Sequence, residues 1–125
     1  MNVLVRPWES IEAHYESVAS RSAGGAHMVG LVRAIRQSSY SCGLYAWTSV
    51  LDLCIVQTPV DYPYAGPHLR ISPQQGGTLD FRYLDTPDAT KQWRRLVPGE
   101  AGFATLQQFL GQLGWFAGEA RGTGA

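Results

Sequence analysis

The stretch LYAWTSVLDLCIVQT, residues 44–58, decides the fold class of this chain of 125 residues. It is rich in β-branched and aromatic residues, which favour strands, and it is long enough to include a bend. We therefore expect one long β-strand here. Because Thr48, Asp52 and Cys54 alternate only imperfectly with the large apolar residues, both faces of this strand should be partly covered. The side chains expected to share the other side are Tyr45, Trp47, Leu51, Leu53 and Ile55.

Three further extended segments follow the long strand. Residues 68–72 and 78–84 alternate apolar with polar side chains, and the Gln-Gly-Gly sequence between them predicts a hairpin turn. Residues 91–97 form the next segment, which a proline and a glycine end. The loop before these segments, residues 59–67, reads PVDYPYAGP, and its three prolines and one glycine exclude a helix or an inner strand.

Three segments have the apolar periodicity of amphipathic helices: residues 7–20, 26–37 and 101–116. A proline suits the first turn of the first helix. Gly24 and Gly25 are expected to end that helix, because glycine weakens helices and is common in connections.

The order of these elements predicts the fold class. Consecutive strands joined by short turns form an antiparallel meander, and amphipathic helices need a sheet to cover. We therefore expect an α+β two-layer sandwich, in which a four-stranded antiparallel meander is covered by two N-terminal helices and one C-terminal helix. Residues 1–117 would form a single domain and residues 118–125 a flexible C-terminal tail. The expected core residues are Trp47, Leu53, Ile55, Phe81, Tyr83, Phe103, Leu106, Phe109 and Leu113.

Charge and composition narrow the classes of partner. Ten basic and ten acidic side chains give a formal net charge of zero, so no overall field would attract nucleic acid or an anionic membrane. A neutral protein is prone to associate with itself, which favours a homo-oligomer. The sequence has no apolar stretch of membrane-spanning length and no signal-peptide core near its start, so we expect a cytoplasmic protein. The preference for arginine over lysine is typical of GC-rich bacterial coding.

The spacing of the cysteine, histidine and glycine residues gives little support for a metal or cofactor site. The sequence lacks the CxxC, HxxxH and HExxH patterns that bind metals. A metal site made of Asp52, Cys54 and His68 would require the fold to bring these residues together from different segments. The glycines of SAGGAHMVG lack the lysine and spacing of a phosphate-binding loop and are interpreted as a hinge between helices. We expect neither a metal nor a cofactor. Cys42, which lies in a predicted loop beside Gly43, is the better candidate for a catalytic thiol.

The side chains predicted to point away from the helices offer a more specific hypothesis. These side chains would meet on neighbouring strands, and they are Arg70, Ser72, Asp80, Arg82 and either Arg94 or Arg95. They could simply pair with one another at a solvated surface, or the arginines could bind a carboxylate or phosphate by bidentate contacts.

The adjoining proline-rich loop adds aromatic rings to these arginines. Rings on rigid loops are preferred anchors for protein partners, although both could instead fold back over the edge of the sheet. We therefore predict a binding site that combines the loop and the arginines. Its residues are Tyr62, Tyr64, His68, Arg70 and Arg82.

Three functional hypotheses follow. The first is a non-enzymatic protein-interaction module of the adaptor, chaperone or immunity kind, which binds a protein partner or a second copy of itself through the aromatic loop or an exposed sheet edge. The second is a domain that binds a small, anionic ligand in a pocket between sheet and helices, lined by Trp47, Tyr83 and Trp93 and approached by Arg70 or Arg82. The third is a small enzyme that uses Cys42.

Overall fold

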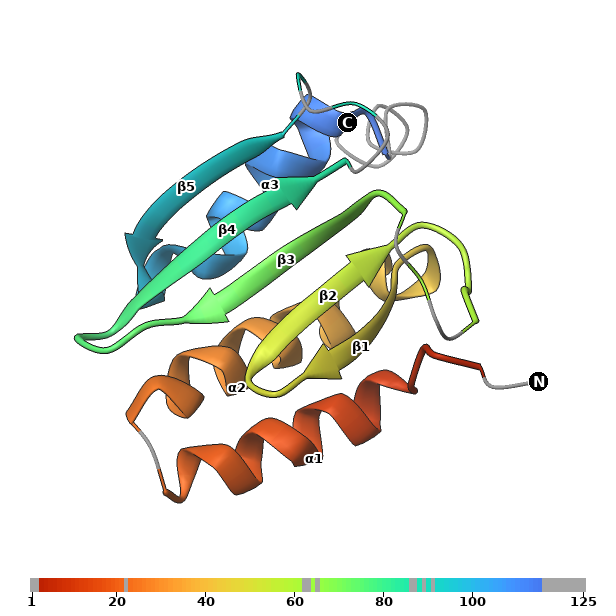
Figure 1. The fold of residues 1–125 in the computed structure, drawn as a ribbon. Helices are drawn as coiled ribbons and strands as arrows, with labels where there is room; N and C mark the ends of the chain where they lie inside the picture. Colours follow the sequence, from red (N-terminus) through yellow and green to blue (C-terminus); the bar gives the residue numbers. More distant parts are fainter. Residues whose placement is uncertain are drawn as a thin grey trace.

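The computed structural model describes residues 3–21, 23–61, 64, 66–85, 88, 90 and 92–115. The predicted tail, residues 118–125, and Phe116 at the end of the last predicted helix lie outside these described residues. The described part contains three α-helices and five strands (Figure 1). In chain order they are α1 (Trp8–Ala19), α2 (Ala23–Gln37), β1 (Tyr45–Ser49), β2 (Asp52–Val56), β3 (His68–Pro73), β4 (Thr78–Leu84), β5 (Trp93–Pro98) and α3 (Gly102–Leu113).

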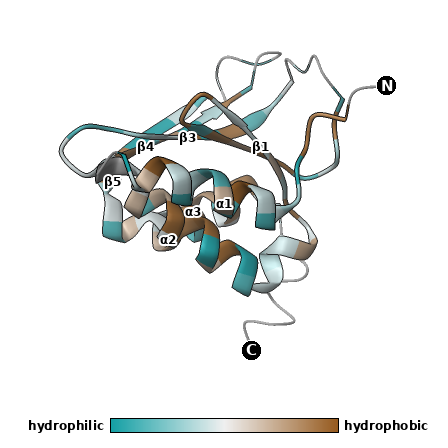
Figure 2. Ribbon diagram, turned by 90° about the horizontal axis from the view of Figure 1, so that it is seen from below, coloured by the Kyte–Doolittle hydropathy of each residue, from teal (hydrophilic) through white to brown (hydrophobic). Residues whose placement is uncertain are grey.

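The strands form one antiparallel sheet in the order β1-β2-β3-β4-β5. Figure 2 shows α1, α2 and α3 together on one face of this sheet. The predicted two-layer α+β fold is therefore confirmed, with five strands in place of the expected four. Gly76 and Gly77 both have positive φ angles in the turn between β3 and β4, which explains the two glycines at this predicted hairpin.

The extra strand arises because residues 44–58 form a hairpin and not one long strand. The chain reverses between Ser49 and Asp52, which pair with each other across the turn. At the tip, Val50 has a φ of 58°, a value that β-branched residues rarely adopt. Tyr15 of α1 donates a hydrogen bond of 2.9 Å to the carbonyl oxygen of Leu51 and holds the tip against the helix layer. Its two central residues, Val50 and Leu51, are types that favour strands over turns, so strand propensity hid the reversal.

The reversal also changes which side chains share a face. Trp47 lies opposite Cys54, and these two residues pack in a small cluster on the side away from the helices. Leu53 and Ile55 instead belong to the main core. The predictions that Trp47 belongs to the main core and that Trp47 shares a side with Leu53 are therefore wrong.

The main core lies between the sheet and the helices. Leu53, Ile55, Phe81, Tyr83, Leu106 and Phe109 are buried in it as expected, and Phe103 and Leu113 pack against it while partly buried. At its centre Phe81 of β4 stacks on Phe109 of α3, with ring centroids 5.8 Å apart and planes within 13° of parallel. Such contact fixes α3 across β4.

The connection between α1 and α2 corrects a further prediction. Gly24 and Gly25 do not end the first helix, because α2 begins at Ala23 and includes both. A Cβ atom on Gly25 would lie 2.5 Å from the backbone nitrogen of Ala19, so only glycine permits this approach of the two helices. The glycines serve helix packing here.

In the described part of the chain, no helix combines the length and the apolar character that a membrane span requires.

Candidate functional site

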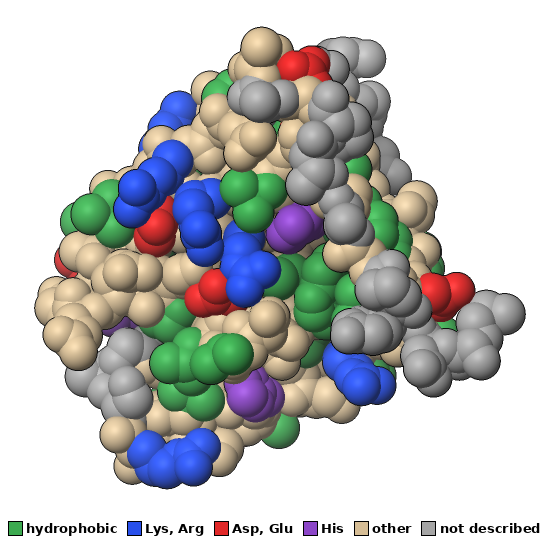
Figure 3. All heavy atoms as spheres, viewed as in Figure 1, with side chains coloured by type: hydrophobic (Ala, Val, Ile, Leu, Met, Phe, Trp, Pro, Cys, Tyr) green, Lys and Arg blue, Asp and Glu red, His purple; other side chains and the backbone are tan. Residues whose placement is uncertain are grey.

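The face of the sheet opposite the helices, here called the outer face, carries one row of side chains across all five strands. Trp47 lies opposite Cys54, Cys54 opposite Arg70, Arg70 opposite Arg82, and Arg82 opposite Arg94. Three guanidinium groups therefore occupy neighbouring positions on β3, β4 and β5. Figure 3, which views this face, shows the basic side chains gathered over the strands with acidic side chains between them.

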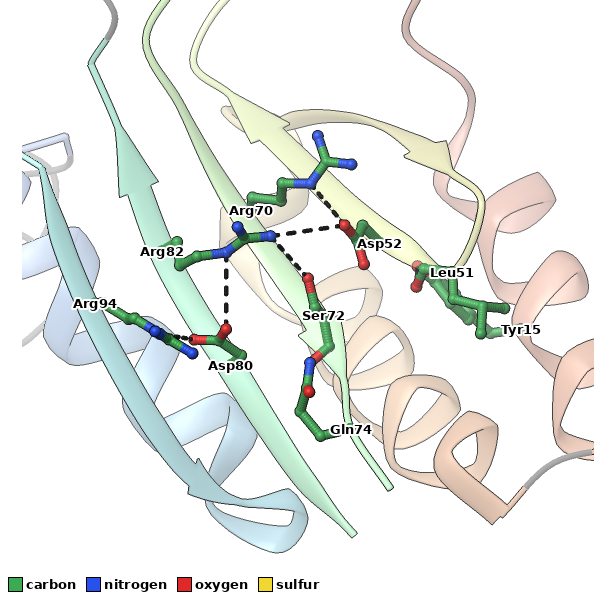
Figure 4. A network of polar contacts seen from close by, with 9 residues as sticks. All are labelled: Tyr15, Leu51, Asp52, Arg70, Ser72, Gln74, Asp80, Arg82 and Arg94. Carbon is green, nitrogen blue, oxygen red and sulfur yellow. Dashed lines mark hydrogen bonds and ion pairs between the residues drawn. The ribbon is translucent and has the colours of Figure 1, made fainter. Parts of the chain in front are cut away.

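Two carboxylates join these guanidinium groups into a network (Figure 4). Asp52 lies 2.6 Å from Arg70 Nε and 3.8 Å from a terminal nitrogen of Arg82. Asp80 lies 3.8 Å from Arg82 Nε and 3.0 Å from Arg94 Nε. The carboxylates thus alternate with the arginines, which lowers the repulsion between like charges on adjacent strands.

Arg82 occupies the middle of the network. Its side chain is 34% exposed, and a terminal nitrogen donates a hydrogen bond of 3.2 Å to Ser72 Oγ. Its Nε atom is buried and lacks a hydrogen-bond partner among the described residues, because Asp80 is too distant for a hydrogen bond. Arg82 is therefore held mainly by electrostatic attraction to both carboxylates.

Arg70 uses only part of its hydrogen-bonding capacity. Its Nε atom bonds to Asp52, whereas its two terminal nitrogens make no hydrogen bond within the described part of the chain. Figure 4 shows those nitrogens pointing away from Asp52. A guanidinium held at Nε with its terminal nitrogens available can bind the two oxygens of a carboxylate.

Next to Arg70, three rings form an aromatic cluster on the outer face. Trp47 of β1 contacts Tyr64 edge to face, with centroids 5.9 Å apart, and lies 5.8 Å from the ring of His68. The Tyr64 hydroxyl donates a hydrogen bond of 2.9 Å to the carbonyl oxygen of Pro67, which fixes this ring over the sheet. Burial raises the pKa of Tyr64, so its hydroxyl stays protonated near neutral pH.

His68 is the most enclosed polar residue of the aromatic cluster. It is 8% exposed, and its Nδ1 atom lies 2.9 Å from the carbonyl oxygen of Gly66. Since a carbonyl oxygen can only accept, Nδ1 carries the proton of this hydrogen bond. Burial lowers the pKa of His68 and favours the neutral ring. The other nitrogen, Nε2, is buried and has no partner among the described residues.

A pocket of about 300 Å³ opens beside the aromatic cluster and is here called the outer-face pocket. It combines aromatic walls with one guanidinium and with small hydroxyl groups at the end of β1. Its lining residues are Leu4, Trp47, Thr48, Ser49, Tyr64, His68 and Arg70.

The structure brings four of the five predicted site residues onto the outer face. Tyr64, His68 and Arg70 line the outer-face pocket, and Arg82 lies opposite Arg70 on the next strand. Tyr62 lies outside the described residues.

The ambiguity between Arg94 and Arg95 is also resolved. Arg94 joins the outer face, whereas Arg95 packs on the helix side, where its guanidinium carbon lies 5.2 Å from the centre of the Phe109 ring.

Sequence reasoning missed two members of this site. The prediction of Trp47 in the core fails because residues 44–58 are not one strand. Asp52 lies on the face opposite Leu53 as predicted, but the sequence pattern does not group it with the arginines. The acidic residue in an otherwise apolar strand was the available signal, because a charge there needs a partner.

The two cysteines differ sharply in environment. Cys42 is exposed at the end of a short 3-10 helix, Ser39–Cys42, whereas Cys54 is buried. Burial raises the pKa of Cys54 to about 11, so that thiol is protonated and unreactive at neutral pH. Among the described residues, His, Cys, Asp and Glu form no group of three or more that could hold a metal ion.

The prediction of a pocket between sheet and helices that is lined by Trp47, Tyr83 and Trp93 is also wrong. Trp47 lies on the outer face, whereas Tyr83 and Trp93 pair on the helix side with ring centroids 5.9 Å apart. These three residues lie on opposite sides of the sheet and cannot line one pocket.

Comparison of the chain with protein-family models, with curated proteins and with solved structures finds no match.

Proposed function

We propose that this chain is a non-enzymatic protein-interaction module that binds its partner on the outer face of the sheet. The observation that carries the proposal is the grouping of outward-directed arginines and an aromatic cluster on the face opposite the helices. Arginine and aromatic side chains contribute most of the binding energy in many protein interfaces, because they combine large contact area with directed hydrogen bonds.

The charges of this face indicate the chemistry of the partner. Within the described network, Arg70, Arg82 and Arg94 outnumber Asp52 and Asp80, so the network has an excess of positive charge although the whole chain is neutral. A partner surface that presents carboxylates would complement this excess.

An exposed apolar side chain lies beside these charges. Leu96 of β5 is 60% exposed, and it pairs with Asp80, which places it on the outer face. Burying Leu96 under a partner would add hydrophobic stabilisation next to the charged contacts. The expected partner therefore combines acidic and apolar side chains.

The proposal is tested by capturing partners from a lysate of the native host with purified, tagged protein. Leu96→Asp adds a carboxylate to the outer face, and Ala104→Asp adds the same group to an exposed position of α3 as a matched control. We expect the wild type and Ala104→Asp to retain a stoichiometric partner that Leu96→Asp loses, because like charge and lost apolar contact both oppose binding.

Two results would argue against this function. One is a partner retained equally by Leu96→Asp. The other is a protein that stays monomeric and captures no stoichiometric partner. Size-exclusion chromatography with light scattering shows whether the captured partner is a second copy of this chain.

A further inference from the structure

The outer-face pocket has features that protein docking alone does not require. It is about 300 Å³ in volume, within the range that small ligands occupy. Trp47 and Tyr64 form its aromatic walls, and Arg70 lies at its side with two terminal nitrogens that make no hydrogen bond within the described part of the chain. Apolar walls with one directed charge are characteristic of small-molecule sites.

A second observation at this pocket also points to a ligand. His68 is more than nine-tenths buried, lines the pocket, and has an Nε2 atom that lacks a partner among the described residues. A buried polar atom without a hydrogen bond has an energetic cost, and such atoms are rare unless water or a ligand satisfies them. Because Nδ1 donates to Gly66, the neutral ring offers Nε2 as an acceptor, which a water molecule bound beside the carboxylate ligand would satisfy.

We propose that the outer-face pocket binds an organic carboxylate with a flat apolar body. The carboxylate would contact the terminal nitrogens of Arg70, and the body would lie against Trp47 and Tyr64. The guanidinium geometry matches the two oxygens of a carboxylate, and aromatic walls stabilise a flat apolar group by burial and ring contact.

Two other ligand classes fit this pocket less well. A metal cation would be repelled by Arg70 and would find too few acidic ligands among the lining residues. Inorganic phosphate would find donors in Arg70 and in the hydroxyls of Thr48 and Ser49, but it has no apolar part to lie against Trp47 and Tyr64. The combination of one cation with apolar walls therefore favours the organic carboxylate.

This proposal does not depend on a protein partner, because a free acid can enter the pocket of the isolated chain. The same chemistry could also come from a protein, whose carboxyl-terminal residue supplies a carboxylate beside an apolar side chain. The experiment therefore compares phenylacetate with the peptide Gly-Gly-Phe.

Nuclear magnetic resonance of the purified protein provides the test. The indole N–H signal of Trp47, assigned with Trp47→Phe, is followed as phenylacetate is added up to about 20 mM, since a single charged contact with a small ring implies millimolar binding. We expect a saturable shift of this signal. Methyl phenylacetate, which keeps the flat body but has neither the charge nor a hydrogen-bond donor, should bind at least about tenfold more weakly.

Matched substitutions assign the effect to one residue. Arg70→Gln should weaken phenylacetate binding by about tenfold or more. Arg36→Gln removes a guanidinium that is also bound through Nε to a carboxylate, but Arg36 lies in the helix layer and does not line the pocket, so this variant should bind within about twofold of the wild type. The comparison with methyl phenylacetate needs no substitution and remains valid if Arg70→Gln does not fold.

The outcomes separate the two sources and decide the proposal. If phenylacetate binds and Gly-Gly-Phe does not, the result supports a free acid as the ligand. Tighter binding of Gly-Gly-Phe, lost when its carboxyl end is amidated, supports a protein terminus. The proposal is wrong if neither compound shifts the Trp47 signal, if methyl phenylacetate binds as tightly as phenylacetate, or if the Arg70→Gln variant binds phenylacetate as tightly as the wild type. Because only purified protein is used, this result is independent of partner capture.

Discussion

Arg70 and Arg82 lie directly opposite each other on β3 and β4. Like charges in this arrangement destabilise a sheet unless other groups offset them. Asp52 is close to both, at 2.6 Å from Arg70 Nε and 3.8 Å from a terminal nitrogen of Arg82. The pair is thus tolerated because a residue at the start of β2 neutralises it, which links the outer surface of the sheet to the stability of the fold.

The first prediction concerns this carboxylate. Asp52→Asn should lower the free energy of unfolding by about 1 to 2 kcal/mol, because it removes a charge-assisted hydrogen bond and leaves two opposed guanidinium groups. Urea denaturation measures the loss. Arg82→Gln in the Asp52→Asn background should recover part of it by removing the repulsion. A loss below about 0.3 kcal/mol for Asp52→Asn would show that solvent already screens the arginines.

The second prediction tests the packing of α3 on the sheet. Phe109 is fully buried and stacks on Phe81, so Phe109→Ala should cost about 3 to 5 kcal/mol of unfolding free energy. Phe103 on the same helix is only partly buried, and Phe103→Ala should cost clearly less. Equal losses in chemical denaturation would mean that α3 packs through a different face.

The third prediction addresses the turn that sequence reasoning missed. Val50 is 87% exposed and has a φ of 58°, so its side chain gains little from packing while its backbone is strained. Val50→Asn should raise the free energy of unfolding by about 0.5 to 1 kcal/mol, since asparagine tolerates this conformation. Leu51→Asn serves as the control and should give no such gain. A destabilised Val50→Asn variant would contradict the described hairpin.

The fourth prediction follows from the lowered pKa of His68. The folded protein keeps this ring neutral below the usual value of 6.5, whereas the unfolded chain binds a proton there. As the pH falls through about 6.5, the unfolded state therefore binds more protons and the free energy of unfolding decreases, until the pH reaches the lower pKa of the folded state.

Unfolding curves measured between about pH 7.5 and 5 for the wild type and His68→Gln reveal this contribution. The wild type should lose more stability over this range than the variant, whatever the difference between them at neutral pH. If the unfolding free energies of the wild type and His68→Gln change equally with pH, the pKa of His68 is the same in the folded and the unfolded chain.

Much of the fold could be predicted because apolar periodicity is a local property of the sequence. The helices and the faces of β3 and β4 follow from it, and so does the position of Arg70 and Arg82 on one surface. The reversal at Val50 and Leu51 could not be found in this way, since neither residue type favours turns and only the contact from Tyr15 of α1 fixes the tip.

The composition of the candidate site depended on that reversal. Once the chain turns, Trp47 moves from the expected core to the outer face and meets His68 and Tyr64, and Asp52 meets Arg70. A shift of one position in a strand exchanges its two faces, so the missed turn placed Trp47 on the wrong face. The pairing of specific charges across strands is likewise set by register, which periodicity alone does not define.

The central claim, that a partner binds on the outer face, is tested most directly by the affinity of a purified partner for two double variants. Arg70→Ala/Arg82→Ala removes two guanidinium groups from the outer face, and Arg33→Ala/Arg36→Ala removes two from the helix layer, where both pair with Glu12. Calorimetric titration should show a dissociation constant at least about tenfold higher for the first variant and within about twofold of the wild type for the second, with both variants folded. The opposite order, or equal affinities for both, would contradict the assignment of the outer face as the binding surface.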